Sequence, residues 1–174
     1  PALQDGDASR CLRNGTFAGF YTQDDIAALV EYAKDRGIRV IPEIEQPEHA
    51  YGYDFLSSSG QIKVCTGAML YNDPDNVTVN TLKKIYSEMA SLFPDAVFHM
   101  GGDEPFLTGN CTIGNVRAME AELARHIISM GKTPMGWEEI LFKTAGAAES
   151  NGKAIVASWA SSSAAEVVAR GFRA

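Results

Sequence analysis

Two adjacent carboxylates, Asp103 and Glu104, follow two glycines at the end of an apolar run, in the stretch FHMGGDEPF. Side by side at the end of a strand, two carboxylates repel each other and are costly to desolvate. A purely structural role explains the pair poorly, and it is therefore the leading candidate for a site that does chemistry. Polar and aromatic residues also follow three other predicted strands, as Glu45 to His49, Trp137 to Glu139, and Trp159.

The elements that position these residues alternate between helix and strand. Thr22 and Asp25 form a capping pattern at the start of a helix that Gly37 ends. The apolar face of this helix comprises Ile26, Leu29, Val30 and Ala33. Residues 38–45 then indicate a buried strand. Further helices are expected around residues 82–93, 116–130, 141–148 and 164–169, and further strands around 96–100, 133–139 and 154–159.

Helices that alternate with strands predict an α/β fold, because parallel strands need a crossover and the crossover is usually a helix. The candidate residues gather where the strands end, which is where both a (β/α)8 barrel and an open doubly wound sheet bind ligands. Topology alone does not separate these two architectures. The polar stretch 50–77 indicates a long loop over the strand ends, and loops of that length usually have a function.

Composition and charge limit the kinds of protein that this chain can be. Of 174 residues, 45% are hydrophobic and 21% are charged, which is typical of a soluble globular domain. A net charge of -7 offers no basic stripe to neutralise phosphates and argues against a nucleic-acid partner. The sequence contains no apolar segment long enough to cross a bilayer and no targeting signal at its start.

The cysteines and the glycosylation sequons indicate a cellular compartment. Cys11, Cys65 and Cys111 lie far apart and lack the close pairing of zinc sites, so we expect no metal site. Sequons occur in polar stretches at Asn14, Asn76 and Asn110. Sequons and cysteines together favour a secreted or lysosomal protein over a cytosolic one.

The segment HMGGDE resembles the His-x-Gly-Gly-Asp-Glu signature of glycoside hydrolase family 20, the β-N-acetylhexosaminidases. The likeness continues through YTQDDIAALVEYAKDRGIRVIPEIEQPEHA, SLFPDAVFHMGGDEP, GWEEI, ASW and GFRA, which fall in family order. Several ordered motifs are a stronger signal than one short signature. The resemblance covers nearly the whole chain and implies a partial (β/α)8 TIM barrel that needs no cofactor.

The resemblance also implies a retaining exo-glycosidase that releases terminal N-acetylhexosamine, in which the substrate's own 2-acetamido oxygen attacks the anomeric carbon. Glu104 would be the general acid, kept protonated by a neighbouring anion and by partial burial. Asp103 would orient the acetamido group and stabilise the oxazolinium-like intermediate. His49 would hydrogen-bond the acid, and Trp137 and Trp159 would form walls around the acetamido group.

Further assignments follow from the same resemblance. His99 would support the strand end without transferring a proton. Cys65 and Cys111 match positions that form a disulfide in animal lysosomal members, while Cys11 has no obvious partner. The implied partner is a glycan, glycolipid or chitin oligomer that carries terminal GlcNAc or GalNAc. The sequence leaves open which hexosamine is preferred and whether the parent enzyme is a dimer.

Two positions depart from the family pattern. Glu45 stands where the family has Asp, which keeps a carboxylate in the substrate-binding site with a longer reach, and Glu48 stands where the family has Gly. A positive φ at residue 48 would strain the turn and displace His49. The family's sugar-binding arginine and strand-eight glutamate have no positions here, so we interpret residues 1–174 as strands three to six, a fragment of a single catalytic barrel domain.

Other functions compete with this interpretation. A catalytically silent glycan-binding or structural relative of the same fold is the alternative, and the intact Asp103–Glu104 pair favours the enzyme. A chitinase-like barrel, which also uses the acetamido group, ranks low because the Asp-x-x-Asp-x-Asp-x-Glu spacing is absent from the sequence.

Overall fold

The computed structural model describes residues 12–13, 16–17, 21–65 and 69–174. Its central sheet consists of β3 (Val97–His99), β4 (Thr133–Trp137) and β5 (Ile155–Ala157), which are parallel and lie in the order β3-β4-β5. Near the start of the chain, β1 (Leu12–Arg13) and β2 (Thr16–Phe17) form a separate antiparallel pair that the sequence did not predict. The parallel sheet with helices between its strands confirms the predicted α/β class.

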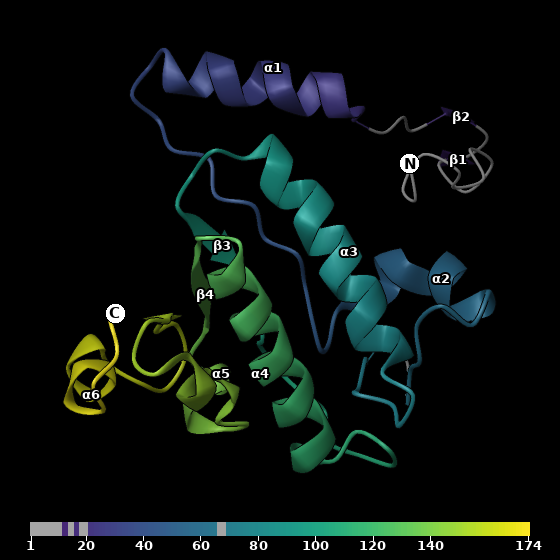
Figure 1. The fold of residues 1–174 in the computed structure, drawn as a ribbon, viewed down its shortest axis with the longest axis vertical. Coiled ribbons are helices and arrows are strands. Elements are labelled where there is room, and N and C mark those ends of the chain that lie inside the picture. The colour runs from purple at the N-terminus through teal and green to yellow at the C-terminus, as the bar shows by residue number, and fades with distance from the viewer. Residues whose placement is uncertain (1–11, 14–15, 18–20, 66–68) are drawn as a thin grey trace.

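Two long helices build the main core beside this sheet. α3 (Val77–Leu92) follows the 50–77 region, and α4 (Ile113–Ser129) joins β3 to β4. The two helices pack side by side, and α4 also contacts β4 (Figure 1). Tyr86 of α3 and Phe98 of β3 are fully buried, with ring centroids 4.8 Å apart. Burial of such large apolar surfaces dominates the stability of a core of this kind.

The first helix, α1 (Gln23–Lys34), begins as predicted but is less buried than predicted. The Thr22 side chain accepts a hydrogen bond from the Asp25 N–H, and the Asp25 side chain accepts one from the Thr22 N–H, which is a complete capping box. Only Val30 and Ala33 of its apolar face are buried, and Leu29 is 49% exposed. Figure 1 shows α1 across one end of the molecule, away from α5 and α6.

The predicted buried strand at residues 38–45 is wrong. The segment runs alongside β3 and exchanges hydrogen bonds with His99, from the Ile44 N–H to the His99 carbonyl (3.1 Å) and from the His99 N–H to the Pro42 carbonyl (2.9 Å). A single parallel bridge joins Glu43 to His99, and Ile38 and Ile41 are exposed. In the register of the Glu43–His99 bridge, residues 38–40 precede Val97, the first residue of β3, and Pro42 lacks an N–H, so a continuous ladder cannot form there.

The predicted long loop at residues 50–77 contains local helical structure. It includes a 3-10 helix, η2 (Ala50–Tyr53), and the short helix α2 (Asp54–Ser58). The structure contains the disulfide between Cys65 and Cys111, with a Cα–Cα distance of 5.9 Å, and this bond ties the loop to the start of α4. Cys11 lies outside the described residues.

The structure describes two of the three predicted glycosylation sites. Asn76 and Asn110 are exposed, as a surface position requires, whereas Asn14 lies outside the described residues. Glycosylation at all three positions stays a prediction.

The C-terminal part of the chain has shorter elements than predicted. In place of one helix at residues 141–148, the structure has α5 (Glu139–Phe142) and the 3-10 helix η3 (Gly146–Ser150). Ala145 between them adopts a left-handed conformation with φ 61°, which interrupts the helix. The last helix, α6 (Ala164–Ala169), has the predicted bounds. Among the described residues, no helix is both long and apolar enough to span a bilayer.

Candidate active site

Two glycines shape the backbone that leaves β3. Gly101 and Gly102 have φ of 66° and 107°, a region that side chains rarely adopt. A Cβ on Gly101 would overlap the Glu45 carboxylate. The Gly102 N–H donates to Oε1 of Glu45 (3.1 Å), and the Gly101 carbonyl accepts from the Trp137 N–H (2.9 Å). Glycine is therefore needed here both for the turn and for the close approach of Glu45.

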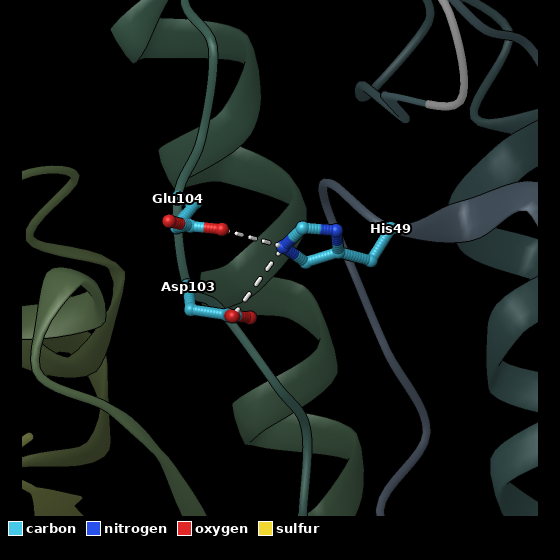
Figure 2. Close-up of side chains that lie close together, drawn as sticks. All are labelled: His49, Asp103 and Glu104. Atoms are coloured by element: carbon cyan, nitrogen blue, oxygen red, sulfur yellow. Dashed lines mark hydrogen bonds and ion pairs between the residues drawn. The ribbon is translucent and has the colours of Figure 1, made fainter.

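Three of the predicted site residues meet beyond this turn. Nε2 of His49 lies 3.1 Å from Oε2 of Glu104 and 3.4 Å from Oδ2 of Asp103. Figure 2 shows the imidazole, which comes from the segment before η2, pointing between the two carboxylates that follow β3. One imidazole can therefore donate its Nε2 hydrogen to either acidic group, which is the arrangement that acid–base chemistry requires.

Backbone conformation brings these side chains together. His49 and Glu104 both adopt left-handed conformations, with φ of 56° and 47°. Such conformations are uncommon outside glycine and cluster at functional sites. Glu48 does not have a positive φ, so the predicted strain at residue 48 is wrong. The left-handed turn falls on His49 itself and directs the imidazole toward the carboxylates.

The two neighbouring carboxyl groups differ in exposure. The Glu104 side chain is 57% exposed, so the burial expected to help keep it protonated is slight among the described residues. The Asp103 side chain is 21% exposed, and its Oδ1 is buried without a hydrogen-bond donor among the described residues. Asp103 thus presents an unused acceptor, whereas Glu104 faces solvent.

Glu45 lies behind Asp103. Burial and, after it, the negative charge of Asp103 raise the pKa of Glu45 to about 8, against the lowering effect of the hydrogen bond from the Gly102 N–H. At neutral pH the Glu45 carboxyl is therefore largely protonated. The structure places Glu45 beneath the site, in contact with Gly101 and Asp103.

The two tryptophans stand next to each other at the strand ends. Trp137, at the end of β4, and Trp159, which follows β5, have ring centroids 6.5 Å apart at an interplanar angle of 67°. Trp159 is 50% exposed. Two indoles at an angle form an apolar corner, which suits the faces and methyl groups of a sugar.

A buried histidine supports the turn from below. His99 is 5% exposed, and its Nδ1 accepts a hydrogen bond from the Gly101 N–H (3.1 Å). Burial lowers the pKa of His99, against the raising effect of the carboxylates Glu43 and Asp103, so the ring is neutral at neutral pH. Its ring packs edge-on against Trp137, whose Nε1–H donates to Glu43 (2.8 Å).

Two glutamates after Trp137 have roles that the sequence analysis did not assign. Glu138 accepts hydrogen bonds from the Trp159 N–H and from the backbone and hydroxyl groups of Ser161 and Ser162, and so holds the segment after β5. Burial opposes its ionisation, but these hydrogen bonds outweigh burial and hold its pKa well below the usual range. Glu139 accepts from the Glu104 N–H and from the Trp159 indole. Two carboxylates directly after a strand-end tryptophan were the signal in the sequence.

The same cluster offers ligand atoms to a cation. One nitrogen of His49 and one oxygen each of Asp103 and Glu104 all lie within 4.8 Å of one another. Imidazole and carboxylate are common metal ligands, although such groupings also occur at exposed acidic sites that bind no ion. The expectation of no metal therefore needs a chemical test.

Comparisons with known proteins identify the origin of this arrangement. Among curated proteins, a β-hexosaminidase of Porphyromonas gingivalis is 32% identical over 169 residues, which cover 81% of this chain and 22% of that protein. The β-hexosaminidase subunit beta of Sus scrofa is 29% identical over 144 residues, which cover 68% of this chain and 27% of that protein. This chain thus spans about a quarter of the length of these relatives.

A solved structure gives the corresponding result for the fold. The GH20 β-N-acetylhexosaminidase of Streptomyces coelicolor matches with a TM-score of 0.67 and 29% identity, over 89% of this chain and 32% of that chain. The parallel sheet and its helices are therefore part of an α/β barrel. The family model described as glycosyl hydrolase family 20, catalytic domain, matches residues 1–174, and the chain belongs to this family.

Proposed function

We propose that the protein is a retaining exo-glycosidase that hydrolyses terminal N-acetylhexosamine by acetamido-assisted catalysis. Family membership supports a hexosaminidase, and the relatives in the comparisons are named as such. The substrate would be a glycan, glycolipid or chitin oligomer that carries terminal GlcNAc or GalNAc. Residues 1–174 would be one portion of a single catalytic barrel domain.

The observation that carries this proposal is the contrast between adjacent carboxyl groups. Asp103 keeps a buried oxygen, Oδ1, without a donor among the described residues, and the N–H of an acetamido group is a donor of the right kind. Glu104 points into solvent, where the leaving oxygen of a bound glycoside could reach it. Two carboxyl groups with different surroundings suit the two different tasks.

The proposed mechanism assigns one task to each residue. Asp103 accepts the acetamido N–H, orients the group, and stabilises the positive charge that develops when the acetamido oxygen attacks the anomeric carbon. Glu104 protonates the leaving oxygen, and its conjugate base then takes a proton from the water that opens the oxazolinium-like intermediate. His49 hydrogen-bonds the acid, while Trp137 and Trp159 contact the acetamido methyl and the sugar face.

The first test measures hydrolysis in the full-length protein. With Glu104→Gln, we expect kcat on an unactivated disaccharide to fall by about 10²–10⁴-fold, and much less on a nitrophenyl glycoside whose leaving group needs no proton. Asp103→Ala should impair both substrates, because it acts on the intermediate. Glu31→Gln is the matched control, because that side chain is 61% exposed and lies on α1.

The same assay separates the enzyme from a silent glycan-binding relative. Wild-type protein that binds N-acetylglucosamine but cleaves neither substrate would establish the silent relative and refute the enzyme. Retention is tested by following the anomer released, and acetamido assistance by fluorinating the acetamido methyl. Fluorination weakens the oxygen nucleophile, so the rate should fall steeply with each fluorine.

A metal is not required by this mechanism. Dialysis against EDTA should leave kcat/KM unchanged, because the positive charge at the anomeric centre is met by Asp103 and the proton is supplied by Glu104. Loss of activity in EDTA that Zn²⁺ or Mg²⁺ restores would instead assign His49, Asp103 and Glu104 to a metal site.

We propose further that the protein is secreted or lysosomal. The Cys65–Cys111 disulfide supports this assignment, because such bonds persist in oxidising compartments and are rare in reducing ones. Glycosidase-sensitive mass at Asn76 or Asn110 in the native protein would test it, and an unmodified, reduced protein in a cytosolic fraction would contradict it.

A further inference from the structure

Glu139, the first residue of α5, connects two parts of the candidate site. Its Oε1 accepts a hydrogen bond from the backbone N–H of Glu104 (3.4 Å), and its Oε2 accepts one from the indole N–H of Trp159 (3.1 Å). These donors follow different strands, β3 and β5. A single carboxylate therefore spans the space between the acid and the aromatic corner.

The main chain of Glu139 is itself held firmly. Its carbonyl accepts hydrogen bonds from the N–H groups of Lys143 and Thr144 (2.9 Å each) and from the Thr144 hydroxyl (3.2 Å). The Thr144 hydroxyl also contacts the fully buried carboxyl of Glu120 on α4. Burial, together with the charge of Glu139, raises the pKa of Glu120 to about 8. The Thr144 hydroxyl lies between the Glu139 carbonyl and the Glu120 carboxyl, and it links the start of α5 to α4.

Resting on the function proposed above, we propose that Glu139 is a positioning residue that holds the general acid, Glu104, and the indole of Trp159 in fixed positions relative to each other. The Glu104 backbone is left-handed, a conformation that its surroundings must maintain, and the bond from its N–H to Glu139 does so. Trp159 is half-exposed and its ring contacts that of Trp137, and the hydrogen bond to Glu139 adds a second restraint on the indole.

The shared carboxylate has a functional consequence. A sugar that packs against Trp159 fixes the indole, which fixes Glu139 and through it the Glu104 backbone. Occupation of the acetamido pocket thereby aligns the acid with the leaving oxygen, and a displacement of the acid of about 1 Å can cost on the order of 10²-fold in rate. The neighbouring Glu138 cannot substitute, because its oxygens are occupied by Ser161 and Ser162.

The test compares Glu139→Ala, Glu139→Gln and Glu149→Gln in the full-length protein. Glu149 is the matched control, because it is a partly exposed glutamate on nearby η3 that pairs with Arg117 and Arg125 outside the site. We expect Glu139→Ala to lower kcat on an unactivated disaccharide by about 10²-fold, and much less on a nitrophenyl glycoside. Glu139→Gln should lie between wild type and Ala, because its one carbonyl oxygen can accept only one of the two hydrogen bonds.

Several outcomes would overturn the inference. Equal losses on both substrates that follow a drop in melting temperature would assign Glu139 a structural role only, and unchanged kinetics in both variants would assign it none. If Glu104→Gln is inactive on the disaccharide while Glu139→Ala is fully active, only this inference fails. If Glu104→Gln keeps wild-type activity, the proposed function fails and this inference fails with it.

Discussion

Replacing Glu120 by Gln should change how the stability of the protein depends on pH. Glu120 is fully buried on α4, its Oε2 contacts the Thr144 hydroxyl, and its Oε1 has no partner among the described residues. Burial raises its pKa to about 8 from an ordinary value of 4.5, against the lowering effect of the hydrogen bonds from Thr144 and the Gly146 N–H. The charge of neighbouring Glu139 contributes to this rise after burial.

The sign and size of this pH dependence of stability follow from proton linkage. Between pH 4.5 and about 8 the unfolded chain has lost the Glu120 proton while the folded chain keeps it. The free energy of unfolding therefore falls by about 1.4 kcal/mol per pH unit through this window, on the order of 5 kcal/mol in all. The stabilisation is fully present below pH 4.5 and is lost as pH rises through the folded pKa.

Glutamine at residue 120 removes this dependence without removing the contact. Its amide oxygen can accept the hydrogen bond from the Thr144 hydroxyl in place of the carboxyl oxygen, and glutamine does not titrate. Glu120→Gln should match wild type near pH 5 and exceed it by several kcal/mol near pH 8. The measurement is the urea midpoint of the full-length protein at a series of pH values, converted to a free energy with the slope of each transition.

Glu122→Gln on the same helix is the control. Hydrogen bonds from Lys83 and Arg125 lower the pKa of Glu122 to about 2, so this residue is ionised in both states between pH 5 and 8. The control should keep the wild-type slope over that range, including whatever slope the Glu45–Asp103 pair contributes. Parallel wild-type and Glu120→Gln curves, or a variant less stable than wild type at pH 8, would refute the assignment of a neutral buried carboxyl.

Two further predictions concern other parts of the molecule. The pair Cys65→Ser and Cys111→Ser removes a crosslink between residues 46 apart and should lower the free energy of unfolding by about 4 kcal/mol in urea, whereas an unchanged midpoint would contradict it. Because burial raises the pKa of Glu45 to about 8, wild-type kcat/KM should fall as Glu45 ionises beside Asp103 above that pH, and Glu45→Gln should remove this alkaline limb. An identical limb in both proteins would refute the coupling.

The sequence predicted helix ends well where residues close to each other in the chain determine them. The capping box of Thr22 and Asp25 starts α1, and the bounds of α6 agree with the prediction. The strand predicted at residues 38–45 failed because an apolar, β-rich run becomes a strand only where a neighbour offers a ladder, and β3 begins too late. The prediction of one helix at 141–148 failed because Ala145 is left-handed, a conformation that none of the residue types there indicates.

The site was predicted through motifs and not through contacts. The motif match named His49, Asp103 and Glu104 together, and the structure brings them within hydrogen-bonding reach. The position of Glu139 after a strand-end tryptophan was a signal, but its role was not predicted because its partners are a backbone N–H and an indole from distant segments. The exposure of Glu104 could not be predicted either, because it depends on which elements cover the strand ends.

Several energetically costly features of the described residues lie together at the candidate site. His49 and Glu104 adopt left-handed conformations that each cost about 1–3 kcal/mol, and Asp103 and Glu45 place two carboxyl groups against each other with little solvent. None of these features contributes to the core around Tyr86 and Phe98. A fold that only needed stability would lose them readily by substitution, because most proteins lie only a few kcal/mol above unfolding. Their joint presence around one imidazole is therefore best explained by a chemical task that requires all of them together.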